Sequence, residues 1–192
     1  MFLLSKPNSD AIQLFLDEQA SERFSYPEIG ATGSEFPSGY NIDHNRIKLG
    51  LGPEVFERAK TAIREWKMFD IGWVELISRD TPIVTGQTVA ILVSHYGFYS
   101  LNAARIVYTL NEQTRFGFAY GTLTEHGEIG EERFSVEYDA DSGEVWYDLF
   151  AFSRPAALLA KIGYPLSRSL QKAFAADSKM AMQRAVSETK IS

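Results

Sequence analysis

Residues 71–153 contain six segments with an apolar residue at almost every second position, separated by short turns. An apolar period of two is typical of strands with one buried face. The predicted strands cover residues 71–78, 87–96, 104–111, 115–122, 131–139 and 144–153. The turns between them contain Gly, Asn, Asp and Pro and are too short to hold a crossover helix. Because neighbouring parallel strands need such a crossover, the pattern predicts an antiparallel meander.

Helical patterns lie on both sides of this predicted sheet. Asn8-Ser9-Asp10 supplies capping residues for a helix over about 10–20, and Pro53 begins a second helix that runs to Lys67. A strand is expected over 42–49. Further helical segments are expected at 156–162 and 166–188, and the second of them carries a long apolar stripe. That stripe must be buried, and the apolar face of the sheet needs cover, so we expect the two to pack together.

The chain of 192 residues has the length of one domain. We expect residues 1–41 to form an N-terminal helix and a wrapping loop, and residues 42–188 to form the body. The fold class is α+β, with about seven antiparallel strands wrapped around a long C-terminal helix. This succession resembles the helix-grip fold of Bet v 1-like, START-like and polyketide-cyclase-like proteins. The resemblance implies a cavity between the sheet and the helix, but fold does not fix function.

Composition excludes several classes of protein. The chain has no cysteine, so a disulfide framework and cysteine-ligated zinc are excluded. No apolar run is long enough for a transmembrane segment, and the N-terminus lacks the pattern of a secretory signal, so we expect a cytoplasmic protein. A formal net charge of −6 argues against nucleic acid as the partner.

Basic residues are concentrated at the C-terminus. Residues 154–192 contain seven Lys and Arg against two Asp and Glu. Such a segment could meet a phosphate, a membrane surface or a protein partner, or it could pack on the acidic body of its own chain. The basic residues are spaced singly, which favours the packing interpretation.

The local sequence also resembles one particular family, the bacterial and plant family known as domain of unknown function 1990. The matching segments are YPEIGAT at 26–32, PSGY at 37–40, LGLG at 49–52, RFGFAYGTL at 115–123, GEERF at 130–134, VWY at 145–147 and FSRP at 152–155, with Trp66, Trp73, His126, Phe174 and Ser178. They cover nearly the whole chain in order. The resemblance implies a Bet v 1-like fold and no established activity, so it assigns no catalytic residues.

Five residues are candidates for binding a ligand in the expected cavity. His95 and Glu132 stand an even number of positions from apolar residues of their strands, and Tyr120 follows two phenylalanines at every second position. Residues two apart on a strand point to the same face, so we expect all three side chains on the apolar face of the sheet. Trp146 and Asp148 share a phase on a strand whose two faces are equally apolar. Each residue could instead have a purely structural role. His95 could be an ordinary histidine at the end of a strand, Glu132 could lie at the rim of the sheet, and the aromatic residues could pack in the core. Asp148 could form an ion pair with a basic residue such as Arg105.

No residues are predicted to be catalytic or to bind a metal or cofactor. The three histidines lack the spacing of a metal site. Ser94 and His95 are adjacent on a strand and point to opposite faces, which argues against a nucleophile and base pair between them.

Three functions fit these observations. The first is an intracellular module that binds an apolar or amphipathic small molecule in the cavity. The second is an enzyme of the cyclase or hydratase type that uses Glu132, His95 or Asp148 as general acid or base. The third is a protein-interaction module whose core is filled by its own aromatic side chains and whose basic C-terminal helix meets a partner. The oligomeric state is not indicated by the sequence.

Overall fold

The predicted strands form one curved antiparallel sheet in a computed structural model of the chain, which describes residues 1–34, 36–77, 80–95, 97–124, 126–156 and 164–187. The strands are β1 (Phe2–Leu3), β2 (Asn41–Leu51), β3 (Val74–Ile77), β4 (Thr88–His95), β5 (Phe98–Asn111), β6 (Arg115–Thr122), β7 (Glu128–Tyr138) and β8 (Glu144–Pro155). The helices are α1 (Ser9–Ala20), α2 (Pro53–Arg64) and α3 (Tyr164–Ser187), with short 3-10 helices η1 (Ala31–Gly33) and η2 (Lys67–Phe69).

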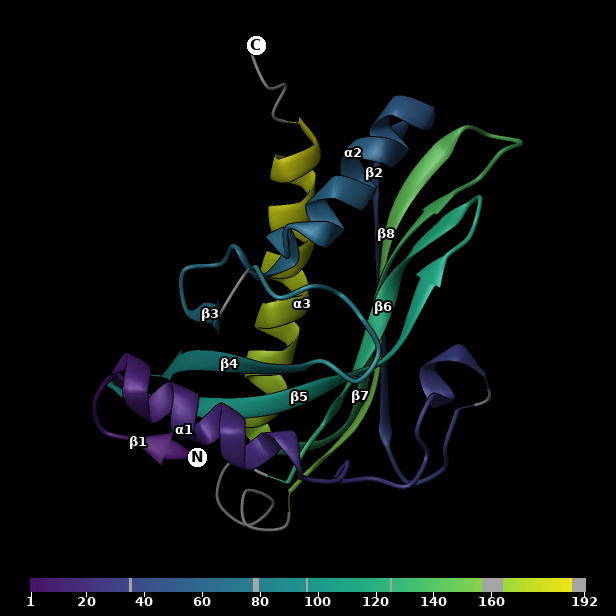
Figure 1. The fold of residues 1–192 in the computed structure, drawn as a ribbon. Coiled ribbons are helices and arrows are strands. Elements are labelled where there is room, and N and C mark those ends of the chain that lie inside the picture. Colours follow the sequence, from purple (N-terminus) through teal and green to yellow (C-terminus); the bar gives the residue numbers. More distant parts are fainter. Residues whose placement is uncertain (35, 78–79, 96, 125, 157–163, 188–192) are drawn as a thin grey trace.

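The order of the main strands in the sheet is β2-β8-β7-β6-β5-β4-β3, and β1 pairs with β5 (Figure 1). Strands β3 to β8 follow one another as neighbours, as the short turns predicted. Strand β2 closes the other edge by pairing with β8, from Asn41 opposite Ser153 to Leu51 opposite Glu144. The expected antiparallel sheet is therefore confirmed, and its curvature produces one concave and one convex face.

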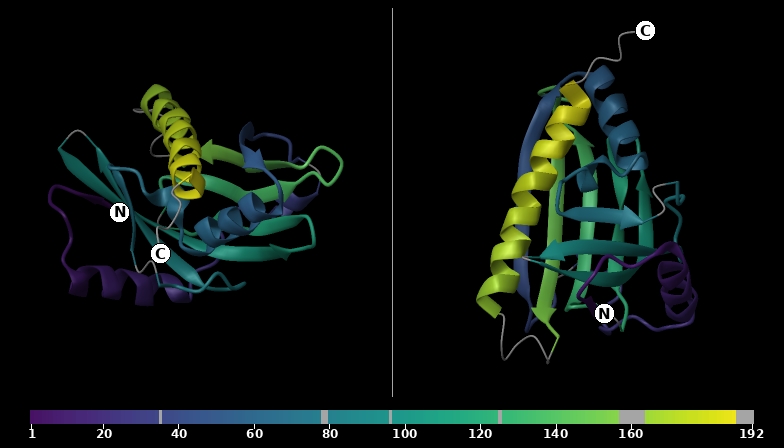
Figure 2. Two further views of the ribbon diagram at one scale, coloured as in Figure 1. Left: turned by 90° about the horizontal axis from the view of Figure 1, so that it is seen from above. Right: turned by 90° about the vertical axis from the view of Figure 1, so that its left-hand side faces the viewer.

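Helix α3 lies across the concave face, and α2 packs beside its C-terminal half (Figure 2). The apolar side of α3 makes a continuous core with the sheet. Tyr147 on β8 forms a hydrogen bond of 2.9 Å with Ser178 on α3. Trp73 Nε1, just before β3, donates to Asp177 on α3 at 2.8 Å. The long C-terminal helix thus packs on the sheet as expected, and its buried apolar residues are Ala175, Ala181, Met182 and Val186. Met180, which the sequence predicted on the same stripe, is instead 51% exposed.

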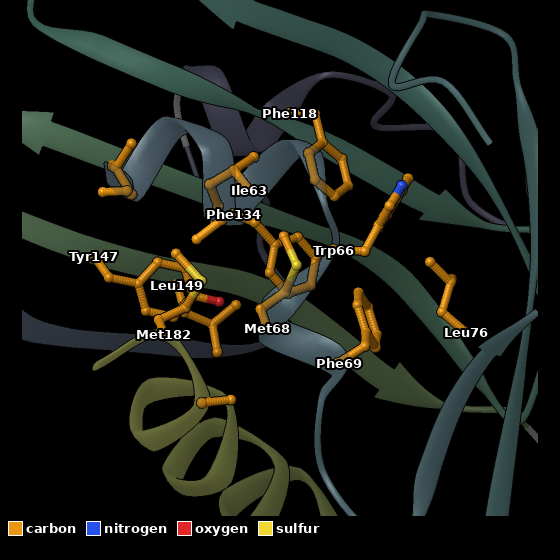
Figure 3. Close-up of a cluster of buried hydrophobic side chains, with 14 of the residues drawn as sticks. Ile63, Trp66, Met68, Phe69, Leu76, Phe118, Phe134, Tyr147, Leu149 and Met182 are labelled. Atoms are coloured by element: carbon orange, nitrogen blue, oxygen red, sulfur yellow. The ribbon is translucent and has the colours of Figure 1, made fainter. Parts of the chain in front are cut away.

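The core between these elements is strongly aromatic (Figure 3). Trp66, Phe69, Phe118 and Phe134 lie together in the close-up, and the rings of Phe118 and Phe134 stack with centroids 5.3 Å apart. Trp66 and Phe118 pack edge to face at 4.7 Å. Apolar packing therefore fills the half of the concave face that lies under α2 and η2.

The charge pattern of α3 also finds a structural explanation. Arg168 donates to both oxygens of Asp43 on β2, at 2.5 and 2.8 Å. Lys179 donates to Asn45, and Arg184 donates to the carbonyl of Asp70. These contacts agree with the interpretation that a basic helix packs on its own acidic body.

The N-terminal part of the chain covers the convex face. Phe15 of α1 packs on β4 and β5 in a second, smaller apolar cluster. The segment between α1 and β2 continues over β7 and β8, where the ring of Phe36 packs at a tilt on Phe150 at 4.9 Å and Tyr40 packs against Phe152 at 5.0 Å. None of the described helices is long and apolar enough to cross a membrane.

Some boundaries differ from the sequence prediction. Strand β5 begins at Phe98, whereas the sequence predicted a start at 104. The prediction was too short because polar Ser100 and Asn102 interrupt the apolar alternation in the first half of the strand. Strand β7 begins at Glu128 rather than at 131. The helix predicted over 53–67 ends at Arg64 and is followed by η2. The helical segment predicted over 156–162 falls, apart from Ala156, outside the described residues.

Candidate ligand-binding cavity

A cavity of about 700 Å³ lies between the concave face of the sheet and the N-terminal half of α3. Phe69, Trp73, Leu149, Phe174 and Ala175 give it an apolar wall where it meets the packed core. Pockets that hold small organic molecules in proteins measure roughly 300–1,000 Å³. The size and wall are therefore those of a small-molecule site.

The opposite end of the cavity is polar, because several strands present polar side chains there. On β4 and β5, His95 Nε2 forms a hydrogen bond of 2.8 Å with Ser100 Oγ, and Asn102 donates to the same oxygen at 3.2 Å. Burial lowers the pKa of His95 below its ordinary value. The other ring nitrogen, Nδ1, is buried and has no hydrogen-bond partner among the described residues. The hydrogen-bonding capacity of this nitrogen is therefore not used by the described residues.

The turn before β7 contributes a second polar group, His126. The backbone N–H of Glu128 donates to His126 Nδ1 at 3.0 Å, and burial lowers the pKa of this histidine to about 4. The side chain of Glu128 accepts a hydrogen bond from Gln171 on α3, and Gln171 also donates to Ser153 Oγ on β8 at 2.9 Å. These contacts join α3 to the polar end of the sheet.

Glu132 and Tyr120 lie between the polar end and the apolar wall. They face each other across β6 and β7, and the Tyr120 hydroxyl donates to Glu132 Oε2 at 2.8 Å. Burial raises the pKa of Glu132 to about 8; the hydrogen bond from Tyr120 opposes this shift, while the negative charges of Glu128 and Asp43 add to it. Burial also raises the pKa of Tyr120. The cavity therefore contains a carboxyl group that keeps its proton at neutral pH.

The structure places three of the five predicted site residues in the cavity wall. His95, Tyr120 and Glu132 line it, as their strand phases predicted. Trp146 and Asp148 are not among its lining residues: they lie on the convex face, where Arg46 stands 4.8 Å from the Trp146 ring. Both faces of β8 are apolar in sequence, so its periodicity could not show which one meets the cavity.

Asp148 belongs to a polar network on the convex face. It is only 2% exposed, Arg133 donates to its Oδ1 at 2.9 Å, and His44 Nε2 lies 2.6 Å from its Oδ2. The ion-pair alternative is therefore correct, with Arg133 as the partner in place of Arg105. Arg105 instead donates to backbone carbonyls at the end of α1, including those of Gln19 and Glu22.

Glu131 is the second buried carboxyl of the convex face, and it is 2% exposed. It accepts hydrogen bonds from the Tyr26 hydroxyl at 2.6 Å, from Gly30 N at 2.7 Å, from Thr32 N at 3.0 Å and from the Thr32 hydroxyl. Gly121 permits this approach, since a Cβ there would lie 2.1 Å from the Tyr26 oxygen. Glu131 therefore fastens residues 26–32 to the outside of the sheet.

Sequence reasoning missed Ser100, Asn102 and His126 as parts of the cavity. The first two lie on β5 at alternate positions, which would have indicated a shared face if the strand had been extended to Phe98. His126 lies in a turn, where no periodicity places a side chain. Within the described residues, no group of three or more His, Asp or Glu side chains is arranged to hold a metal ion.

Comparison with protein families gives one match that spans most of the chain. Residues 25–181 match the family model described as "Domain of unknown function (DUF1990)". A UPF0548 protein of Dictyostelium discoideum is 36% identical and covers 97% of this chain and 96% of its own length. A UPF0548 protein of Deinococcus radiodurans is also 36% identical, over 90% of this chain and 92% of its own. Relatives therefore occur in bacteria and in eukaryotes other than plants.

Comparison with solved structures identifies the fold. Ara h 8.0201 is 13% identical with a TM-score of 0.50, over 77% of this chain and 98% of its own. A norcoclaurine synthase point mutant from Thalictrum flavum, solved in complex with a transition-state analogue, is 12% identical with a TM-score of 0.50, over 79% of this chain and 97% of its own. The fold is therefore the Bet v 1-like helix grip expected from the sequence, and these identities carry no conclusion about activity.

Proposed function

The chain belongs to the DUF1990 family, and from its cavity we propose that it is a binding module for an apolar or amphipathic small molecule. The observation that carries this proposal is the composition of the cavity wall. An apolar wall at one end and a few convergent polar groups at the other are what an amphipathic ligand requires. His95, Tyr120 and Glu132 are the polar residues that we assign to ligand binding.

The alternative of a core filled by the chain's own side chains is not supported by this geometry. Aromatic packing fills the space under α2, but about 700 Å³ remains between the sheet and the first half of α3. Three of the described basic side chains of α3, Arg168, Lys179 and Arg184, contact the body, and Lys172 is exposed. A protein partner bound through α3 is therefore the weaker proposal.

Native mass spectrometry of the freshly purified protein tests the binding proposal. We expect extra mass in the native state that disappears after denaturation, and a melting temperature that rises with the concentration of added apolar compounds. A native mass equal to that of the chain alone, together with no thermal shift from a panel of fatty acids, aromatic ketones and aromatic amines, would contradict it.

A second function is favoured by one specific observation, the proton retained by Glu132. A carboxyl with a pKa near the working pH is suited to general acid catalysis, and Tyr120 fixes its orientation. An enzyme of the cyclase or hydratase type would use this proton at a carbonyl or an alkene of its substrate. Incubation with unsaturated ketones, followed by mass analysis for isomerised or hydrated products, would test this alternative, and Glu132→Gln should abolish any turnover.

A further inference from the structure

Glu132 is a cavity carboxyl with one hydrogen-bond donor and no cationic partner among the described residues. Tyr120 donates to Oε2 at 2.8 Å, and the other oxygen, Oε1, receives no donor from that part of the chain. The nearby arginine on α3, Arg168, is already bound to both oxygens of Asp43. Glu132 is half-buried in the cavity wall, and a half-buried carboxyl without a counter-ion is more stable in its neutral form than it would be in open water.

The remaining charged and titratable groups around the cavity raise the pKa of Glu132, are neutral, are already engaged, or, in one case, are exposed to solvent. They come from β2, β4, β7, β8 and α3 and from the turn before β7: Asp43, His95, Glu128, Tyr147, Arg168, Lys172 and His126. Glu128 and Asp43 raise the pKa of Glu132, and both histidines have lowered pKa values and are neutral at pH 7. Lys172 is exposed at the surface of α3.

The position of the proton on Glu132 follows from the hydrogen bond to Tyr120. When Oε2 accepts the tyrosine hydroxyl, the proton of the neutral carboxyl lies on Oε1, the oxygen that receives no donor from the described residues. Glu132 is then a donor in a cavity whose neighbouring wall is apolar. A donor of this kind needs an acceptor, since an unmade hydrogen bond is costly away from water.

We infer that the ligand carries a neutral hydrogen-bond acceptor, a ketone, aldehyde or ester carbonyl, that binds the Oε1 hydroxyl of Glu132 while its apolar body lies against Phe69, Leu149 and Phe174. The inference rests on the proposed binding function and specifies its ligand chemistry. An alkylamine is already a cation at neutral pH, so it would have to lose its hydration and either meet a neutral carboxyl or wait for Glu132 to release its proton to solvent. A carboxylate would add a negative charge near Asp43 and Glu128, whose charges already raise the pKa of Glu132.

Three probes with one aromatic body test this inference: acetylnaphthalene, naphthylethylamine and naphthoic acid. Their dissociation constants are measured by calorimetry with the wild type, Glu132→Gln, Glu132→Leu and the control Glu137→Gln. Glu137 lies on the same strand but on the convex face, where it pairs with Arg46. Circular dichroism and thermal melting establish that each variant is folded.

We expect the ketone to bind the wild type at least about tenfold more tightly than the amine or the acid at neutral pH. Its affinity should fall about tenfold per pH unit above the Glu132 pKa of about 8. Glu132→Leu should weaken ketone binding about tenfold, and Glu132→Gln, which retains an N–H donor, should weaken it less and remove the pH dependence. Glu137→Gln should bind as the wild type does.

Two kinds of failure are distinguishable. If none of the probes binds and native mass spectrometry finds no retained molecule, the proposed binding function fails and this inference fails with it. If the amine or the acid binds more tightly than the ketone, or if Glu132→Leu leaves ketone affinity unchanged, the cavity binds small molecules but the assigned ligand chemistry is wrong.

Discussion

Folding the chain at neutral pH requires Glu132 to hold a proton that the unfolded chain releases. Its pKa rises from an ordinary value of 4.5 to about 8 on folding, chiefly because of burial. Between these two values the folded state binds more protons than the unfolded state, so the free energy of unfolding must decrease as pH increases. The shift corresponds to about 5 kcal/mol over the whole window, or about 1.4 kcal/mol per pH unit within it.

The variant Glu132→Gln isolates this contribution, because glutamine has nearly the same shape and does not titrate. Urea unfolding of both proteins from about pH 5 to about pH 8 should show that the wild type loses about 4 kcal/mol relative to the variant. The comparison removes the contributions of all other titrating groups, including His126, whose pKa is shifted in the opposite direction. For the control Glu137→Gln, the free energy of unfolding should change with pH as it does for the wild type.

A flat difference would refute the reasoning. If the stabilities of the wild type and Glu132→Gln differed by an amount that stayed constant within about 0.5 kcal/mol over this range, Glu132 would have the same pKa in both states. Water or a cation would then have to compensate for its burial in the cavity. The same result would mean that Glu132 is ionised at neutral pH, so it could not donate a hydrogen bond to the inferred carbonyl ligand.

Four further substitutions test other parts of the structure. Glu131→Ala should destabilise the protein by about 3 kcal/mol and increase proteolysis within 21–41, because it removes the acceptor of four hydrogen bonds. As pH falls from 6.5 to about 4, the wild type should lose about 3 kcal/mol relative to His126→Gln in urea titrations, since the half-buried His126 resists protonation that the unfolded chain accepts. Phe134→Ala, in the closed part of the core, should cost about 3–5 kcal/mol in urea unfolding, whereas Phe36→Ala, at 63% exposure, should cost less than about 1 kcal/mol.

The sheet could be predicted from the sequence because its connections are short. Turns such as Asp141-Ser142-Gly143 leave no room for a crossover, so they fix both strand direction and strand order between β3 and β8. The pairing of β2 with β8 could not be derived in this way, since α2 and most of the sheet separate these two strands in sequence.

The cavity was harder to predict than the sheet, because the residues that form it weaken the pattern used to find strands. Ser100 and Asn102 occupy inward positions of β5, where an ordinary core would have apolar side chains. Their polarity shortened the predicted strand, although their hydrogen bonds with His95 and with each other show why the position tolerates them. A strand that loses its apolar alternation at one end only is therefore a signal of a polar cavity in a fold of this kind.

Glu131 and Glu132 show how the same residue type acquires two roles on one strand. The pleat directs their side chains to opposite faces of β7, so each meets a different part of the chain. Glu131 meets residues 26–32, which supply four hydrogen bonds and bury it in a closed network. Glu132 meets Tyr120 and a cavity, and one of its oxygens receives no donor from the described residues. The unused hydrogen-bonding capacity of the cavity carboxyl, and not its sequence neighbourhood, distinguishes a group suited to a ligand from one that holds the fold together.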